Sequence, residues 1–190
     1  PNANVLVMTL ELCSLHMQID ESHDCILANS LFADGVAAAL VSSKKPHPSE
    51  VHAASLEHFH TTTIPSGIDD MAWYIGDQGF DLKLSNYVPQ VIESGIEPII
   101  KDIDDPETVD HWAVHPGGRS ILDKVQDSMG LDPAALDIPR EVLRTHGNMS
   151  AATIMFVLKE MLPQAKAGEK TMAVAFGPGL TVEGGILVSV

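Results

Sequence analysis

HWAVHPGGRSILDKV, residues 111–125, is the stretch of this sequence that decides its fold class. An apolar run ends at His115, a Pro-Gly-Gly turn follows, and residues 119–129 have the spacing of a helix. The stretch therefore predicts a strand, a tight loop and a helix start. Ligands of open α/β sheets bind at the carboxyl ends of the strands, which makes His115 a candidate for chemistry. A histidine after a strand is also an ordinary loop residue, so this one residue leaves both interpretations open.

The flanking sequence alternates between strand and helix patterns, which extends the α/β prediction to the whole chain. Val5–Leu12 and Val36–Ser42 are nearly continuous apolar runs, typical of strands that are covered on both faces. The segment 151–162 is apolar nearly all round, so we expect a helix buried in the middle of the molecule. Further helices are predicted at 26–32, 88–103 and 139–146, and further strands at 50–62, 80–84, 172–176 and 180–190, with a polar loop at 44–49 and a hairpin turn at 76–79.

Composition limits the function classes. There are 26 acidic and 11 basic residues, and the net charge of −15 argues against nucleic-acid binding. No apolar run is long enough to span a bilayer, so we expect no membrane segment. Cys13 and Cys25 both lie in apolar surroundings, which indicates a reducing compartment, the cytoplasm, rather than a disulfide framework.

A second candidate residue precedes the predicted central helix. Asn148 and Ser150 lie in Gly147–Ser150, where short polar side chains are favoured as helix caps. From the residues alone, a cap and a functional role for Asn148 are about equally compatible with this position.

Three motifs in this order and spacing carry a resemblance to a known family: HPGGRSIL at 115–122, THGNMSAATIMF at 145–156 and AFGPGLTVEGGIL at 175–187. They resemble the C-terminal half of the type III polyketide synthases, the chalcone and stilbene synthase family. The similarity extends upstream through SLFADG at 30–35 and LELCSL at 10–15. Ketoacyl synthase III enzymes share the fold and the His/Asn pair, but usually follow the histidine with Gln-Ala-Asn, so Pro116-Gly117-Gly118 favours the polyketide branch.

The resemblance implies the C-terminal half of a thiolase-like fold over residues 1–190, a mixed five-stranded sheet with helices on both faces. The family acts by decarboxylative Claisen condensation of an acyl-CoA starter with malonyl-CoA, as a homodimer and with no cofactor beyond these thioesters. Its catalytic set is a cysteine, a histidine and an asparagine; His115 and Asn148 match the last two, and Phe32 matches the gatekeeper phenylalanine. The cysteine lies upstream in the family. We therefore expect this chain to hold half of an active site, with the nucleophile on an N-terminal half that precedes Pro1.

Neither cysteine of this chain matches the nucleophile. Cys13 matches a cavity position of the family, and Cys25 lies just ahead of the helix that carries Phe32. His16 and Trp73 match further cavity positions, and plant enzymes often carry threonine, threonine and glycine at these three places. The departures favour a bacterial-type enzyme that makes alkylpyrones, alkylresorcinols or related products. The resemblance also assigns Gly177, Pro178 and Gly179 to the cavity, and Gly117, Gly118 and Ser120 to the coenzyme A entrance.

Two other classes of function, a metal site and a non-catalytic half-domain, are alternatives to a condensing enzyme. A metal site could use His111 and His115, but on a strand these residues are roughly 13 Å apart. His58 and His60 share one strand face, yet no further ligand has a recognisable spacing, so we predict no metal site. The second alternative is a non-catalytic acyl-binding or assembly half-domain, which docks on a partner that supplies the cysteine.

Overall fold

The computed structural model describes residues 2–44, 52–77 and 79–190. Residues 45–49 of the predicted polar loop, the first two residues of the predicted strand 50–62, and Gln78 of the predicted hairpin turn lie outside the described residues. The strands are β1 (Asn4–Glu11), β2 (Gly35–Ser42), β3 (Ala54–Thr63), β4 (Met71–Gly76), β5 (Gly79–Leu84), β6 (His111–Val114), β7 (Lys170–Gly177) and β8 (Thr181–Ser189). The helices are α1 (His23–Leu31), α2 (Val88–Ile103), α3 (Arg119–Met129), α4 (Asp137–His146) and α5 (Thr153–Met161), with short 3-10 turns between them.

The central layer is a mixed sheet with the order β3-β8-β7-β6. β6 runs parallel to β7, whereas the β7–β8 and β3–β8 pairs are antiparallel. The prediction of a mixed sheet with helices on both faces is confirmed, but the expected number of five strands is wrong, because this sheet has four strands within the described ranges. β1 and β2 pair only with each other and form a separate layer.

Side chains that alternate along β6 divide the interior into two cores. Trp112 and Val114 face a large core with α2 and α3, and the intervening Ala113 faces a smaller core with α4 and α5. α2 contributes a stripe of fully buried isoleucines at helical spacing, Ile92, Ile96 and Ile100. The amphipathic pattern of 88–103 therefore predicted both the helix and its buried face.

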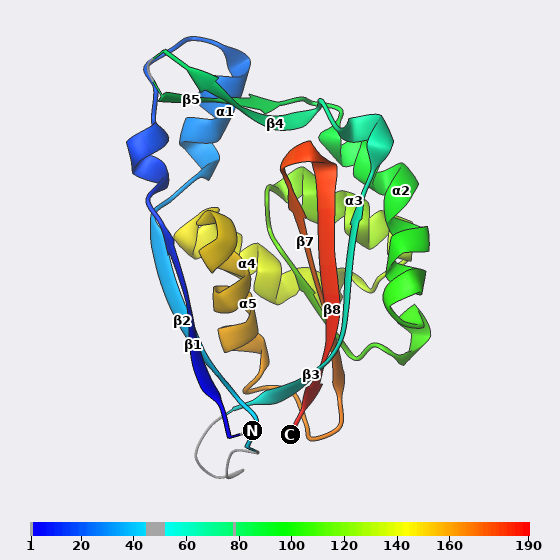
Figure 1. Cartoon of the computed structure of the whole chain (residues 1–190). Helices are drawn as coiled ribbons and strands as arrows, with labels where there is room; N and C mark the ends of the chain where they lie inside the picture. The colour runs from blue at the N-terminus through cyan, green and yellow to red at the C-terminus, as the bar shows by residue number, and fades with distance from the viewer. Residues whose placement is uncertain (1, 45–51, 78) are drawn as a thin grey trace.

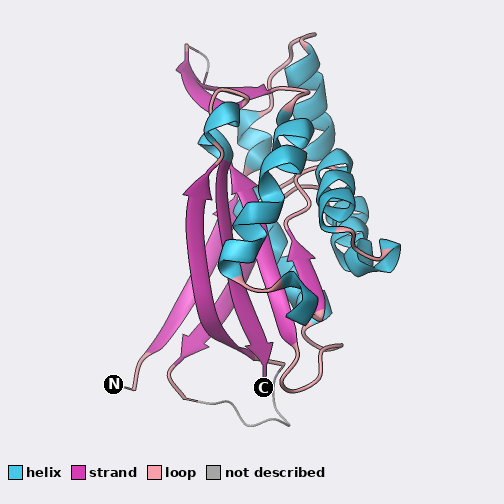
Figure 2. Ribbon diagram, turned by 90° about the vertical axis from the view of Figure 1, so that its right-hand side faces the viewer, coloured by secondary structure: helices cyan, strands magenta, loops and turns pink. Residues whose placement is uncertain are grey.

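α5 lies between the two layers of strands in Figure 1. Figure 2 views the molecule from the side of α2 and shows helices in front of the strands. α5 packs on β6 on one side and on β2 on the other, with Val157 and Met161 buried. This confirms the prediction of a helix in the middle of the molecule, although its first turn, Ser150–Ala152, is a 3-10 helix. Asn148 and Ser150 therefore lie at the N-terminal end of the α5 region, Ser150 as the first residue of the 3-10 turn.

The strands β1 and β2 correct one prediction. The apolar pattern predicted strands covered on both faces, but Leu6, Met8 and Leu10 are 61%, 63% and 64% exposed. In the described structure one face of this pair packs on α5 and its 3-10 turn, and nothing covers the other. The apolar pattern therefore predicted the two strands correctly, but the burial that it predicted for β1 and β2 is wrong for the described residues. Within the described residues, no helix is both long and apolar enough to cross a membrane.

A third layer is the hairpin of β4 and β5, which lies across the end of the molecule above β7 (Figure 1). The strands pair from Met71↔Leu84 to Gly76↔Gly79, as the glycines of the predicted turn indicated. An isolated two-stranded hairpin is marginally stable in water, so contacts with other elements have to hold it in place.

Candidate active site

His115 follows directly on β6, and its backbone extends the sheet by one residue. Its N–H donates to the Val174 carbonyl at 2.8 Å, and its carbonyl accepts from Gly117 N–H at 2.9 Å. The residue is only 8% exposed, and burial lowers the pKa of its imidazole from 6.5 to about 4. At neutral pH the ring is therefore neutral in this structure, with one nitrogen that carries a proton and one that accepts.

Gly117 lies against the edge of this ring. A Cβ atom built on Gly117 would come within 3.7 Å of His115 Cδ2 and 3.9 Å of its Nε2. The Cδ2–Nε2 edge thus faces the glycine loop, and a bound group that follows the loop backbone passes this edge at close range.

Asn148 is held from three sides at the start of the α5 region. Its backbone N–H donates to the Leu31 carbonyl, and its carbonyl accepts from Ala33 N–H, both at 2.8 Å. Its side-chain Oδ1 accepts from Ser150 N–H at 2.9 Å, which fixes the orientation of the amide. Nδ2 then donates to the Gly117 carbonyl at 3.2 Å, and its second N–H is left for another acceptor.

These bonds join the two predicted site residues through one loop. Gly117 lies beside the His115 ring, its carbonyl accepts from Asn148 Nδ2, and Phe32 forms a parallel bridge with Asn148. Ser150 has a positive φ of 49°, a conformation that costs a non-glycine residue ~1–3 kcal/mol and that concentrates at functional sites. His115, Asn148 and Phe32 are therefore brought together, as the resemblance implied.

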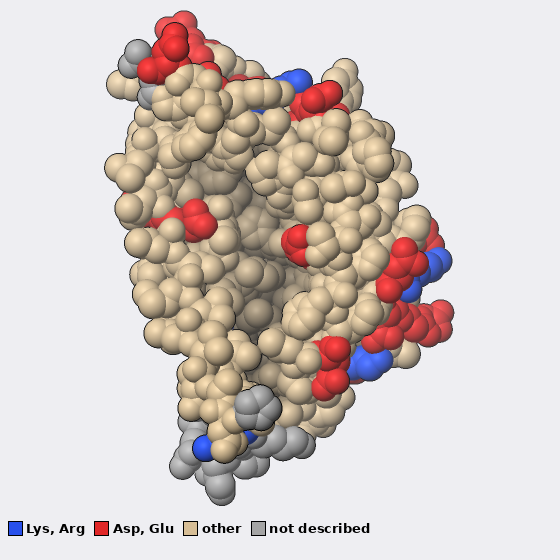
Figure 3. All heavy atoms as spheres, in the orientation of Figure 1, with Lys and Arg blue, Asp and Glu red and all other residues tan. Residues whose placement is uncertain are grey.

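A cavity of about 880 Å³ opens beside this cluster. Figure 3 shows a face of the molecule that is hollowed along its middle, where few Lys, Arg, Asp or Glu atoms are seen. The residues that line the cavity include the predicted positions His115, Asn148, Phe32, Trp73, Gly117, Gly118, Ser120, Gly177 and Pro178. Gly179 is not among the lining residues of this cavity or of the smaller one; its φ of 72° makes the turn into β8, where it lies near Thr181 and Ile68.

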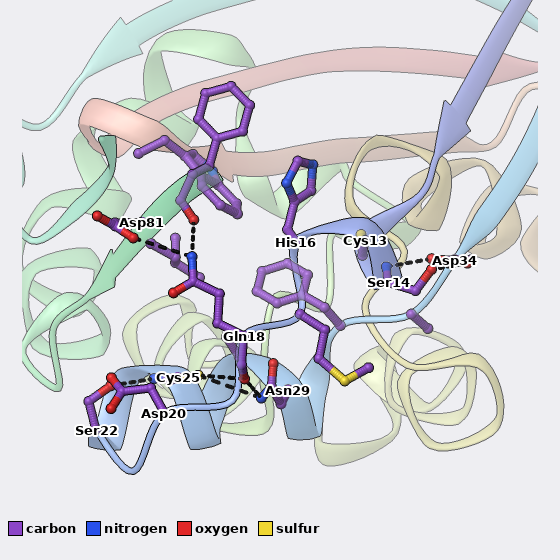
Figure 4. Close-up of a pocket in the computed structure, with 17 residues that line it drawn as sticks. Cys13, Ser14, His16, Gln18, Asp20, Ser22, Cys25, Asn29, Asp34 and Asp81 are labelled. Atoms are coloured by element: carbon purple, nitrogen blue, oxygen red, sulfur yellow. Dashed lines mark hydrogen bonds between the residues drawn. The ribbon is translucent and has the colours of Figure 1, made fainter. Parts of the chain in front are cut away.

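A second cavity of about 430 Å³ adjoins the first, and both are lined by Phe32, Trp73 and Leu82. Cys13 and His16 line this smaller cavity together with Cys25 (Figure 4). The His16 ring lies 5.7 Å from the Trp73 ring and 5.4 Å from the Phe80 ring, so three aromatic side chains form one wall. Burial, with the nearby carboxylates of Glu11 and Asp34, raises the pKa of the Cys13 thiol, which opposes a role as a nucleophile.

The hairpin contributes cavity residues that the sequence did not single out. Phe80, Leu82 and Leu84 alternate along β5, and Leu82 lines both cavities. This period-two pattern was visible in the sequence, but only the fold places it opposite α1. Gln18 and Asn29 are further lining residues without a sequence signal of their own.

The histidines considered as metal ligands are separated in the fold. His111 begins β6 and its Nε2 lies 2.8 Å from a carboxylate oxygen of Glu169, whereas His115 follows the other end of this strand and lines the cavity. Across the described ranges there is no group of three His, Cys, Asp or Glu side chains arranged to hold a metal ion.

Comparison with known proteins relates this geometry to a family. The chain is 29% identical to the C-terminal type III polyketide synthase domain of Steely1, a type I/III hybrid from Dictyostelium, with a TM-score of 0.89 over 98% of this chain and 54% of that one. PKS-I from the brown alga Ectocarpus siliculosus has a TM-score of 0.86 and 29% identity, over 100% of this chain and 54% of that one. A Bacillus subtilis (strain 168) protein named "Putative chalcone synthase" is 32% identical over 96% of this chain and 53% of its own length.

The chain thus spans about half the length of these proteins. A family model described as chalcone and stilbene synthases, C-terminal domain, matches residues 55–190. The expected thiolase-like α/β fold is confirmed by the structural neighbours. Since the family match takes in more than half of the chain, this protein belongs to the chalcone and stilbene synthases and carries their C-terminal domain.

Proposed function

We propose that this chain forms the His/Asn half of a polyketide synthase active site, which condenses an acyl-CoA starter with malonyl-CoA. The observation that carries the proposal is that Gly117 lies beside the buried His115 ring and accepts from the Asn148 amide, and that all three residues line a cavity of about 880 Å³. Family membership supports the same reaction class.

The two side chains suit the decarboxylation step. Loss of CO₂ from malonyl-CoA leaves an electron pair that delocalises onto the thioester oxygen as an enolate. The free N–H of Asn148 Nδ2 and a ring N–H of His115 are donors for that oxygen. Both side chains are neutral, so no charged donor has to be desolvated during the reaction. Preorganised donors of this kind contribute roughly 3–4 kcal/mol each to the transition state.

The nucleophile is the part that these residues do not supply. Cys13 and Cys25 line the smaller cavity, whereas His115 lines the larger one. We propose that a thiolate from a segment outside the 190 residues enters beside His115, and that this N-terminal half also covers the exposed face of β1 and β2. The chain alone would then be inactive, and the complete protein would need no metal or organic cofactor beyond coenzyme A thioesters. A homodimer is the proposed assembly of that complete protein.

The coenzyme A arm would enter through the glycine loop. Gly117, Gly118 and Ser120 line the larger cavity at the start of α3, and neither glycine has a side chain to obstruct a pantetheine group. The departures at Cys13, His16 and Trp73 support an alkylpyrone- or alkylresorcinol-type product rather than a chalcone.

The test is release of CO₂ and acetyl-CoA from malonyl-CoA by the full-length protein. We expect His115→Ala and Asn148→Ala each to lower the rate about 10²–10³-fold. His23→Ala and Asn4→Ala replace the same residue types outside both cavities and should keep the wild-type rate. Full activity in either site variant would refute the assigned roles. A full-length wild-type protein that binds acyl-CoA without decarboxylating malonyl-CoA would instead favour the non-catalytic half-domain.

A further inference from the structure

The wall between the two cavities is built from segments far apart in the sequence. One side is the segment from Cys13 to Asp34, which ends in α1, and the other is the β4–β5 hairpin. The hairpin carries Trp73 and Leu82, two of the three residues shared by the cavities, and α1 leads into the third, Phe32. The residues shared by the two cavities therefore come from the hairpin and from the residue that follows α1.

Gln18 connects these two sides, one through its side-chain amide and the other through its main-chain carbonyl. Its side-chain Nε2 donates to the Phe80 carbonyl at 2.9 Å and to Asp81 Oδ1 at 3.2 Å, on β5. Its main-chain carbonyl accepts from Asn29 Nδ2 at 2.8 Å and from Cys25 Sγ at 3.1 Å, on α1. Figure 4 shows Gln18 extended between α1 and the hairpin strand.

The remaining support of the hairpin at this edge is apolar. His16, Trp73 and Phe80 contact one another through their rings, and β5 packs on α1. Ring contacts tolerate sliding, because offset and edge-to-face geometries have similar energies. Hydrogen bonds have a narrow range of distance and angle. In the described part of the chain, the hydrogen bonds between the Cys13–Asp34 segment and the hairpin are the two that Gln18 Nε2 donates.

We propose that Gln18 is a positioning residue that holds the β4–β5 hairpin at a fixed distance from α1 and thereby sets the length of acyl chain that passes from the larger cavity into the smaller one. The substrate part of this inference rests on the proposed function, whereas the mechanical part, the hold on the hairpin, does not. Gln18 lines the smaller cavity, whereas His115 and Asn148 line the larger one, so its loss changes chain-length selection without removing the decarboxylation donors.

The variants follow from the bonds. Gln18→Met keeps the length of the side chain and removes both donated hydrogen bonds. Gln18→Glu places a carboxylate against Asp81 and the Phe80 carbonyl, and Asp81→Asn in that background restores a donor toward Glu at position 18. Gln164 Nε2 also donates to a main-chain carbonyl, that of Glu160, but lies outside both cavities, which makes Gln164→Met the matched control.

The experiment has two readouts on the full-length protein. Amide hydrogen exchange of residues 71–84 should accelerate by about 5–30-fold in Gln18→Met, the factor expected for one or two lost hydrogen bonds, while α2 and α3 keep their rates. With a series of acyl-CoA starters, the chain length of the preferred starter and product should shift, with KM changed more than kcat. Malonyl-CoA decarboxylation should stay within about twofold of wild type, since the donors are untouched. Asp81→Asn should restore part of the wild-type pattern in Gln18→Glu, because it returns one hydrogen bond while the Phe80 carbonyl still lacks its donor, and Gln164→Met should change nothing.

Unchanged exchange in the hairpin, or acceleration spread over the whole chain, would overturn the positioning role. Faster exchange with an unchanged chain-length profile would overturn the link to substrate selection. If the wild-type protein shows no decarboxylation, the proposed function fails, while the exchange rates still decide whether Gln18 holds the hairpin.

Discussion

The buried His115 ring predicts a specific loss of stability in acid. The pKa of this imidazole is about 4 in the folded chain, against 6.5 for the unperturbed group, and desolvation by burial is the cause. Below pH 6.5 the unfolded chain takes up a proton at this position that the folded chain refuses until about pH 4. The stabilisation is therefore complete above pH 6.5 and is lost as the pH falls from 6.5 to 4.

The size of the effect follows from the shift. A change from 6.5 to about 4 is 2.5 pKa units, and at ~1.4 kcal/mol per unit this gives roughly 3 kcal/mol over the whole window. At pH 4.5 most of that loss, roughly 2–3 kcal/mol, should already be present. Such a loss is a large fraction of the free energy of unfolding of a typical domain, which is about 5–15 kcal/mol.

Urea unfolding at pH 7.5 and pH 4.5 measures the loss, and comparison with His115→Gln isolates it from the other titrating groups. The wild-type chain should lose roughly 2–3 kcal/mol more than the variant between these pH values. His23→Gln, which replaces an exposed histidine, should keep the wild-type pH dependence. An NMR titration that places the pKa of His115 near 6.5, or equal pH dependence in wild type and His115→Gln, would refute the reasoning.

Two further predictions concern the frame around the site. Gly147 has a φ of 75°, and a Cβ there would approach the Leu31 carbonyl at 3.1 Å, so Gly147→Ala should lower the free energy of unfolding by ~1–3 kcal/mol. Gly130 has a φ of 60° and open space around it, so Gly130→Ala should lower the free energy of unfolding by only ~1 kcal/mol. Equal losses of the two variants in urea unfolding would contradict the close approach at Gly147. Leu6 and Leu40 face each other across β1 and β2 and are 61% and 68% exposed, so the isolated chain should self-associate and bind a hydrophobic dye. The pair of substitutions Leu6→Lys and Leu40→Glu should reduce both, as judged by light scattering and dye fluorescence, and a wild-type monomer that binds no dye would count against an open apolar face.

The sequence predicted the elements best where one periodicity decided both structure and burial. α2 and α3 begin and end at the predicted residues, because a helical apolar stripe is bounded by clear stop signals at Asp104-Asp105-Pro106 and Gly130. The placement of His115 at the end of β6 was predicted from the apolar run that precedes it. The predicted burial of β1 is wrong, because an apolar pattern indicates that a strand has surface suited to burial but does not indicate which residues cover that surface.

The sequence predicted that His115 and Asn148 belong to the candidate site, but it did not predict most of the residues that line the cavity walls. His115 and Asn148 lie in motifs that resemble a family, whereas the contact between them through Gly117 needed the fold. The role argued for Gln18 could not be seen in the sequence at all. Its hydrogen bonds reach partners as far as 63 residues along the chain, and a single glutamine in a loop carries no periodic or motif signal.

The His115 pKa also connects this half-site to the half that would complete it. Burial alone keeps the ring neutral in this structure, and a neutral ring cannot stabilise a thiolate by charge. A thiolate that approaches within ~4–6 Å favours the protonated ring and raises its pKa, while the ring in turn lowers the pKa of the thiol. We therefore expect the pKa of His115 to rise when the proposed cysteine-bearing half is present, and to fall back when that cysteine is replaced by alanine. A His115 titration that is the same with and without the cysteine would show that the thiolate and the ring do not form a coupled pair.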